Sequence, residues 1–227
     1  MEVNLERDAR VSAAEELEQI ATEVRGCRAC KLFQTATKGV PGEGPADAKI
    51  MFIGEAPGFN EDRQGRPFVG AAGQFLEELL ALAGLRRQDV FIANVVKHRP
   101  PNNRDPEPDE IAACAPYLER QIAAIDPRVI VTLGRFSMGR YFPGEKISRI
   151  HGQPRWVGGR MIVPMLHPAA ALHQPQNRPL IEADFRRLPE FLADAEQRVA
   201  QQRPASSSPA EQLGESDGPD MEQLSLF

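Results

Sequence analysis

Four short apolar runs, rich in β-branched residues, constrain the fold of this chain more than any other feature of its sequence. They span residues 49–53, 90–96, 129–133 and 161–166. Runs of this length that stay apolar throughout are typical of strands buried on both faces of a sheet. A sheet of this kind needs helices on each side, so the runs predict an α/β fold with a parallel sheet.

Helical patterns lie before, between and after these runs. Helices are predicted over residues 13–25, 75–83, 108–124 and 180–192. Gly84 stops the second pattern, and Pro108 begins the third at a position where proline is tolerated. The alternation of strands and helices predicts one α/β domain in which a parallel sheet lies between two helical layers.

The two ends of the chain differ from its body in charge and composition. The formal net charge is −5, and residues 1–23 and 199–227 contribute −5 and −4, which leaves +4 on residues 24–198. A mildly basic body permits contact with a phosphate backbone but does not demand it. Residues 199–222 have the composition of a disordered acidic linker, so we place the folded domain in residues 1–198.

Several locations and classes of protein are disfavoured by the sequence. No stretch approaches the roughly 18 consecutive apolar residues of a membrane helix. Met1–Arg10 is charged and lacks the apolar core of a signal peptide. Three cysteines are too few, and odd in number, for a disulfide framework. We therefore expect a monomeric cytoplasmic protein with no membrane association.

Three of the predicted strands end in residues that are suited to a binding site. Residues 54–58 (Gly-Glu-Ala-Pro-Gly) follow the first strand, Asn94 lies near the end of the second, and His167 follows the last. Open α/β sheets bind ligands at the carboxyl ends of their strands. Each feature alone is weak, because such loops, amides and histidines are commonly structural. Because all three features fall at the carboxyl ends of predicted strands, we interpret them as parts of one site.

Together with residues 65–70 (Gly-Arg-Pro-Phe-Val-Gly) and 152–154 (Gly-Gln-Pro), these segments resemble the motifs of family 4 uracil-DNA glycosylases. Their order and spacing match from about Cys27 to Leu192. The resemblance implies a three-layer α/β/α domain with a central four-stranded parallel sheet. It also implies a base excision repair enzyme that flips uracil out of DNA and hydrolyses its N-glycosidic bond.

The resemblance assigns three residues to the reading of the flipped base. Phe68 matches the aromatic residue that stacks on uracil. Asn94 matches the amide that separates uracil from cytosine, because it accepts from N3–H while it donates to O4. His167 matches the donor near O2, where negative charge develops as the bond breaks.

A carboxylate is expected to stabilise the oxocarbenium-like sugar and to position the attacking water. Glu61 matches the position of this carboxylate in the family, and Glu55 and Asp62 are neighbouring candidates. Glu55 and Ala56 are also expected to contact the substrate. The chain departs from the family at His173, where an arginine is common, which puts in doubt any contact made by that arginine.

Residues 27–30 form a Cys-x-x-Cys pair, and Cys114 follows far along the chain. The resemblance implies a [4Fe–4S] cluster held by four cysteines, and His98 stands where the third is expected. Imidazole replaces thiolate on iron in Rieske centres. We therefore expect Cys27, Cys30, His98 and Cys114 to be the ligands, with structural zinc as the alternative.

Two other functions remain open at this point. A related group of uracil-binding proteins crosslinks covalently to DNA, and it also has a histidine after the second strand. That group carries a reactive histidine in a basic loop soon afterwards, whereas residues 99–106 here contain none. We therefore favour a turnover enzyme over a uracil-DNA binding or crosslinking protein, and over a structural metalloprotein.

The last five residues, 223–227 (Gln-Leu-Ser-Leu-Phe), form an apolar end to an acidic tail. They resemble the short motif by which bacterial repair and replication proteins bind the sliding clamp. The resemblance assigns Gln223 to the rim of the clamp pocket and Leu224, Leu226 and Phe227 to its apolar cleft. A frayed terminus is the alternative.

Overall fold

The computed structural model describes residues 12–202 of the 227-residue chain. Its sheet has the strand order β2 (Phe91–Asn94), β1 (Ile50–Gly54), β3 (Val129–Leu133), β5 (Arg160–Met165) and β4 (Arg155–Val157). The first four of these strands are parallel, as the sequence predicts. The predicted clamp motif at residues 223–227, and nearly all of the predicted linker, lie outside the described residues.

The expectation of four strands is wrong by one, because β4 adds an antiparallel strand beside β5 at the edge of the sheet. This strand has only three residues, of which Trp156 is half-buried and its two neighbours are exposed. A glycine pair, Gly158-Gly159, turns the chain from β4 to β5. A strand of three residues is too short to give an apolar run, and a turn joins it directly to the next strand.

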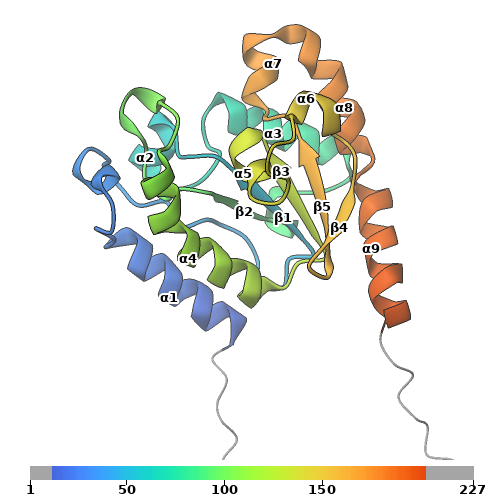
Figure 1. The fold of residues 1–227 in the computed structure, drawn as a ribbon, viewed down its shortest axis with the longest axis horizontal. Helices are drawn as coiled ribbons and strands as arrows, with labels where there is room; N and C mark the ends of the chain where they lie inside the picture. Colours follow the sequence, from blue (N-terminus) through green and yellow to red (C-terminus); the bar gives the residue numbers. More distant parts are fainter. Residues whose placement is uncertain (1–11, 203–227) are drawn as a thin grey trace, which may run out of the picture.

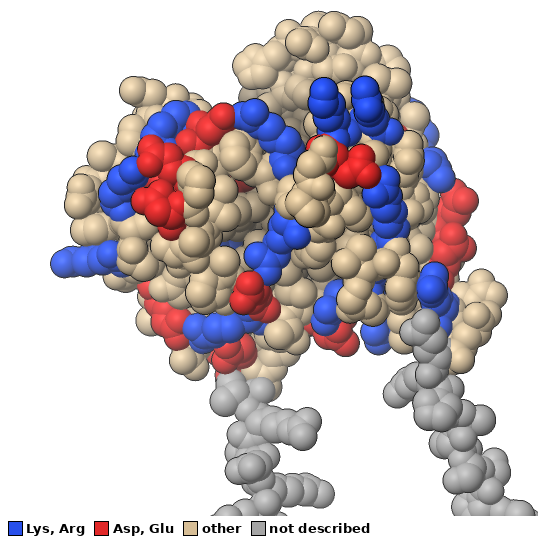
Figure 2. Space-filling model, in the orientation of Figure 1, with Lys and Arg blue, Asp and Glu red and all other residues tan. Residues whose placement is uncertain are grey.

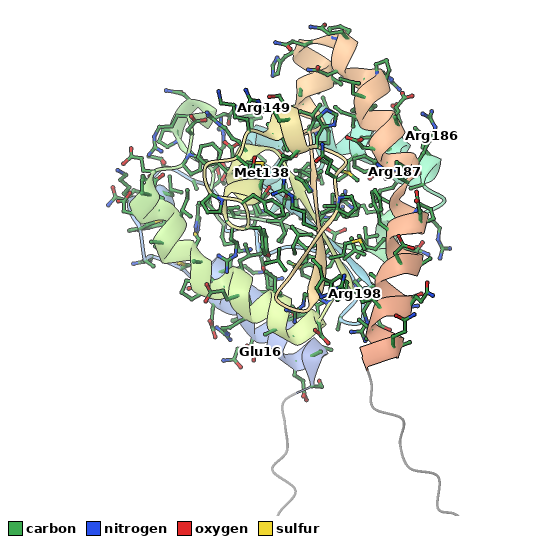
Figure 3. The ribbon with its side chains drawn as sticks, turned by 45° about the vertical axis from the view of Figure 1, so that its right-hand side comes forward. Glu16, Met138, Arg149, Arg186, Arg187 and Arg198 are labelled. Atoms are coloured by element: carbon green, nitrogen blue, oxygen red, sulfur yellow. The ribbon has the colours of Figure 1, made fainter. Side chains whose placement is uncertain are left out.

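Helices cover both faces of the sheet (Figure 1). One face packs against α3 (Ala71–Leu82), α8 (Arg178–Arg186) and α9 (Leu188–Gln202). The other packs against α4 (Pro108–Ile125), α5 (Arg135–Gly139) and α6 (Ile147–Ile150), and α1 (Ala13–Arg25) lies on α4. Figure 3 shows side chains filling the space between the sheet and both layers. The predicted three-layer domain is therefore confirmed.

Local sequence explains where these helices begin and end. Ser12 accepts a hydrogen bond from the backbone of Glu15, whose carboxylate in turn accepts from the backbone of Ser12, so the two form a capping box at the start of α1. The helix predicted over residues 180–192 is two helices that meet at Arg187. Pro189 lies in the first turn of α9, and a proline disfavours continuous helix through the residues before it. Helix α9 extends to Gln202, past the boundary expected at residue 198.

Short helices and loops at the carboxyl edge of the parallel strands position the candidate site. They are α2 (Phe59–Gln64), which follows β1, the turn η3 (Pro101–Asn103) after β2, and α7 (Ala169–His173) after β5. The remaining short turns are η1 (Lys31–Gln34), η2 (Arg87–Asp89) and η4 (Pro175–Asn177). Within residues 12–202, no helix has the length and apolar character to cross a membrane.

Candidate active site

A cavity of about 640 Å³ opens at the carboxyl edge of the sheet. The segments that contribute to its wall are the loop after β1, helix α2, residues 68–72, the loop around residues 100–105, and residues 167–173. The predicted residues Glu55, Ala56, Glu61, Phe68 and His167 all line it. Residues that are spread over more than 100 positions of the chain thus meet in one place.

Asn94 ends β2 and pairs in register with Gly54 of β1. Its side chain is buried, with 2% of the residue exposed, and its Oδ1 atom has no hydrogen-bond partner among the described residues. A buried acceptor without a partner is costly, and native proteins rarely keep one without a reason. The free Oδ1 atom is therefore suited to a ligand that brings its own N–H donor.

Gly54 explains how the amide and the aromatic ring come together. A Cβ atom at this position would lie 2.7 Å from two ring atoms of Phe68 and would also overlap Oδ1 of Asn94. Both side chains therefore pack directly on the backbone of Gly54. A side chain at residue 54 would displace one or both of them.

Phe68 has a backbone that its surroundings hold in place. Its φ angle is +50°, a value that is uncommon for a residue other than glycine. Arg87 donates hydrogen bonds to the carbonyl oxygens of Phe68 and Pro67, and helix α3 presents Gly73 where a Cβ would overlap the Phe68 carbonyl. These contacts compensate for the strain and fix the ring at the base of the cavity.

His167 stacks on Phe68, with ring centroids 5.5 Å apart. The backbone N–H of Ala169 donates to Nδ1 at 3.1 Å, so the neutral ring carries its proton on Nε2. Burial lowers the pKa of His167 to about 4, against the opposing charge of Glu61. At neutral pH the side chain is therefore an uncharged Nε2–H donor.

Glu61 accepts three hydrogen bonds from the backbone. One carboxylate oxygen accepts from the N–H groups of Val69 and Gly70, both at 2.8 Å, and the other accepts from Gly58 at 3.1 Å. The side chain thereby ties the loop that carries Phe68 to the start of α2. This role keeps Glu61 in the cavity wall but occupies both of its oxygen atoms.

Glu55 is the other acidic residue among the predicted site residues in the wall. It is half-buried, and burial raises its pKa, as does nearby Asp105, while Arg135 opposes the rise. Asp62, by contrast, is buried outside the cavity and accepts from the backbone N–H groups of Thr37 and Lys38. The structure therefore separates the three acidic candidates, of which Glu55 has no hydrogen bond to its carboxylate among the described residues.

The predicted metal ligands are less closely assembled. Cys114 is buried, and its pKa is raised to about 11, chiefly by burial and to a smaller degree by Cys30 and Cys27. Burial lowers the pKa of His98, and the neighbouring charge that opposes this is Asp62. Within residues 12–202, no three side chains of the types His, Cys, Asp and Glu are grouped closely enough to bind a metal ion.

Lys97 is a residue to which the sequence assigned no role. It is fully buried, and its ammonium group donates to the Asn94 carbonyl oxygen at 3.0 Å and to Gln121 on α4 at 2.7 Å. Its backbone N–H donates to the Cys114 sulfur at 3.4 Å. Lys97 thus links the end of β2 to helix α4. A lysine at the end of an apolar run was the only sequence signal of this role.

The last wall of the cavity contains no acidic residue, lysine or arginine. Residues 168–177, around α7, contain no Lys, Arg, Asp or Glu, and Figure 2 shows this uncharged area at the top of the molecule. Leu172 on α7 is 49% exposed. His173, which stands where the family commonly has arginine, lines the cavity and brings no permanent positive charge.

Comparison with known proteins agrees with this geometry. A model of the uracil DNA glycosylase superfamily matches residues 41–194. The type-4 uracil-DNA glycosylase of Sulfurisphaera tokodaii is 52% identical over 187 residues, which cover 77% of this chain and 84% of the relative. The enzymes of the same name from Archaeoglobus fulgidus and Thermotoga maritima are 49% and 46% identical, over 78% of this chain and 94% and 96% of their own lengths. The resemblance drawn from the motifs is confirmed, and the chain belongs to the uracil-DNA glycosylase superfamily, among its type-4 members.

Proposed function

We propose that this protein removes uracil from DNA by hydrolysing the bond between uracil N1 and the sugar C1′ atom, which leaves an abasic site. The observation that carries the proposal is the unpaired Oδ1 atom of Asn94, which is buried beside Phe68, a residue of the cavity wall. Type-4 uracil-DNA glycosylases from several organisms match most of the chain. Deoxyuridine would have to leave the base stack to reach these groups.

Asn94 would distinguish uracil from cytosine. Its Oδ1 atom accepts from the N3–H group of uracil, and its Nδ2 group donates to O4. Cytosine offers an acceptor at N3 and an amino group at C4, so both contacts would become repulsive. A buried polar group left unpaired in this way costs about 1–3 kcal/mol. Phe68 would stack on the ring of the bound base.

His167 would stabilise the leaving group. Cleavage of the N1–C1′ bond leaves the bonding electrons on uracil, where they spread to O2 and O4. A neutral Nε2–H donor near O2 stabilises this charge without first losing a proton to it. The lowered pKa of His167 keeps the ring in this form at neutral pH.

Glu55 is the better placed acid to assist water. Its ionised carboxylate would take a proton from the water that attacks C1′ and would favour the positive charge on the sugar. Glu61 would act as a positioning residue, because its three backbone hydrogen bonds hold the loop that carries Phe68. This proposal moves the role expected for Glu61 to its neighbour in the same cavity.

An alkaline cleavage assay tests the proposed function directly. The full chain is incubated with a labelled oligonucleotide that contains one uracil, and abasic sites are then cleaved and resolved on a denaturing gel. We expect many products per enzyme molecule, and none from an oligonucleotide with cytosine at the same position. Complete retention of uracil would reject the proposal.

The same assay separates the enzyme from a uracil-DNA binding or crosslinking protein. That alternative predicts a single burst equal to the amount of protein, together with a protein–DNA adduct that survives denaturation. A turnover enzyme continues past the burst and leaves no such adduct. The absence of histidine from residues 99–106 favours turnover.

We further propose that the three cysteines bind a [4Fe–4S] cluster of structural function, with His98 as the fourth ligand. The support is the chemistry of the donor set, since Cys27, Cys30 and Cys114 form no disulfide and thiolates are the usual ligands of such clusters. A bound cluster would pin residues 27–30 to helix α4, which carries Cys114.

Iron content and visible absorption test the cluster without reference to activity. Anaerobically purified protein should be brown and should contain about four irons per chain. Cys114→Ser should lose iron, whereas His98→Cys should retain it. Stoichiometric zinc without iron would exclude the cluster, and full iron retention by His98→Ala would exclude His98 as a ligand.

We also propose that residues 223–227 bind the sliding clamp, although they lie outside the described residues. The support is their sequence, which places Leu224, Leu226 and Phe227 after a polar linker. Calorimetry with the purified clamp should detect binding by the full chain but not by a version that ends at Met221. Equal binding by both, or by neither, would reject this proposal.

A further inference from the structure

Phe59 is an exposed aromatic side chain at the wall of the cavity. It is the first residue of helix α2 and lines the cavity. Its exposed fraction is 53%, the highest of the large apolar residues within residues 12–202. None of the uracil contacts proposed above uses it. A single exposed apolar residue is common on protein surfaces, so the significance of this ring depends on the groups around it.

Two arginines accompany this ring. The guanidinium carbon atoms of Arg99 and Arg63 lie 5.3 and 5.5 Å from the ring centroid, within the range of a cation–π contact. Arg99 comes from the loop after β2, and Arg63 from α2 itself. An aromatic ring and two positive charges therefore meet beside the opening that would admit a flipped nucleotide.

These two arginines also differ from others around the cavity. Arg104 forms a bidentate ion pair with buried Glu110, and Arg135 is paired with Asp105. Within residues 12–202, neither Arg63 nor Arg99 has a carboxylate oxygen within 4.0 Å. Their charges are therefore free to attract an anion, whereas those of Arg104 and Arg135 are largely neutralised by the protein.

We propose that Phe59, Arg63 and Arg99 form a subsite for the nucleotide adjacent to the flipped uridine, with the base contacting the ring and phosphates contacting the guanidinium groups. This inference rests on the proposed function, because it takes the cavity to be the uracil site. Stacking on aromatic side chains and charge contacts to the backbone are the usual means by which proteins bind single strands. A neighbouring base reaches such a ring only when it leaves its own stack, so the subsite favours uracil in unpaired DNA.

The decisive experiment removes the neighbouring base and the ring in turn. The substrates are single-stranded oligonucleotides with one uracil. In each pair of substrates, the nucleotide next to uracil is either normal or an alkali-stable analogue that lacks its base. One pair changes the neighbour on the 5′ side of uracil, and a second pair changes the neighbour on the 3′ side. In wild-type protein, loss of the base on one side should lower kcat/KM by roughly 5- to 150-fold. Phe59→Ala should lower kcat/KM similarly on the normal oligonucleotide and should be insensitive to the analogue.

Matched variants separate this subsite from general effects of mutation. Phe59→Tyr keeps the ring and should behave like wild type. Leu82→Ala removes another exposed apolar side chain, 43% exposed at the far end of α3, and should retain the sensitivity to the neighbouring base. If Phe59→Ala retains that sensitivity, or wild-type protein lacks it on both sides, the subsite does not exist.

The arginines are tested through the dependence of KM on salt. The affinity for a single strand falls as salt rises, and each phosphate contact steepens the slope of log affinity against log salt by about 0.7. Arg63→Gln and Arg99→Gln should therefore each make this slope shallower by about the same amount. Arg198→Gln is the control. Arg198 also lies over an aromatic ring, that of Trp156, but it stands on α9, on the opposite side of the molecule from α2 (Figure 1). Unchanged slopes in both test variants would overturn the assignment of the phosphates.

The proposed function and the subsite fail in different ways. If wild-type protein releases no uracil, the proposed function is wrong. The subsite is then tested by binding instead of kcat/KM, with fluorescence anisotropy measuring the affinity of the protein for the same oligonucleotides. If uracil is released but the ring and the neighbouring base act independently, only the subsite is wrong.

Discussion

The cavity at the carboxyl edge of the sheet and the region around Cys114 differ in what holds their side chains. In the cavity, Glu61 is fixed by three backbone donors, and the ring of His167 is oriented by the N–H group of Ala169. Around Cys114, Cys30 packs against the same hydrophobic cluster, but no group of three candidate ligands is assembled in the described residues. Backbone hydrogen bonds therefore orient the side chains of the first region, whereas apolar packing surrounds those of the second.

This difference shows which functions a fold can preorganise by itself. Catalytic donors gain from being fixed before the substrate arrives, since no reorganisation is then needed in the transition state. Cluster ligands must converge on a group that the polypeptide does not contain, and the binding free energy of that group contributes to folding. Lys97 joins the two regions, because it bonds to Asn94 on one side and to Cys114 on the other.

The largest effects should follow from removing the preorganised groups. Asn94→Ala and His167→Ala should each lower the single-turnover rate of uracil excision by about 10²–10³-fold, the usual cost of losing one such donor. Rapid-quench measurements under enzyme excess would give these rates. Rates within a few-fold of wild type for both variants would show that the cavity is not the reaction centre.

A smaller but still large loss is expected for Gly54→Ala. The added methyl group would displace the Asn94 amide or the Phe68 ring, and a shift of about 1 Å at a catalytic site can cost about 10²-fold in rate. The same single-turnover assay measures it. Gly139→Ala is the matched control, because a Cβ at that position meets nothing within 4 Å, and it should retain wild-type activity. A fully active Gly54→Ala would show that the cavity adapts readily.

Removal of a cysteine should separate the two regions. Cys114→Ser should abolish iron binding and lower the thermal midpoint of unfolding. Near 20 °C, however, its excision rate should fall less than that of His167→Ala, since no cysteine lines the cavity. Iron analysis, calorimetry and the excision assay on one preparation would show this. A rate loss as large as that of His167→Ala would mean that the cluster region orders the cavity.

The smallest effect concerns pH. The proposed activation of water by Glu55 needs the ionised carboxylate, so kcat/KM should fall as the pH drops through the raised pKa of Glu55. Asp105 contributes to that raised value, so Asp105→Asn should lower the pKa and shift the acid limb of the profile to lower pH. Burial keeps the pKa of His167 lower, at about 4. Glu55→Gln should abolish the acid limb. If it does so but Asp105→Asn leaves the limb at the same pH, then Asp105 does not act on the pKa of Glu55.

Much of the fold follows from local sequence. The run at residues 129–133 becomes β3 with the same bounds, and the helix predicted over residues 13–25 becomes α1. The run at 90–96 gives a shorter strand, β2, beyond which the N–H groups of Val95 and Val96 bond to the carbonyl oxygens of Gly54 and Glu55. Burial on both faces leaves a clear apolar signal, whereas the end of a strand depends on partners elsewhere.

The sequence by itself determined the α/β class, the order of the main elements and a small set of candidate site residues. Only the tertiary structure decided which contacts those residues make. Three acidic side chains within eight positions look alike in sequence, and the distant N–H groups of residues 69 and 70 set Glu61 apart from Glu55. Hydrophobic periodicity is a local property that the sequence displays directly. Hydrogen-bond partners, burial and pKa shifts arise from segments that meet only after the chain has folded.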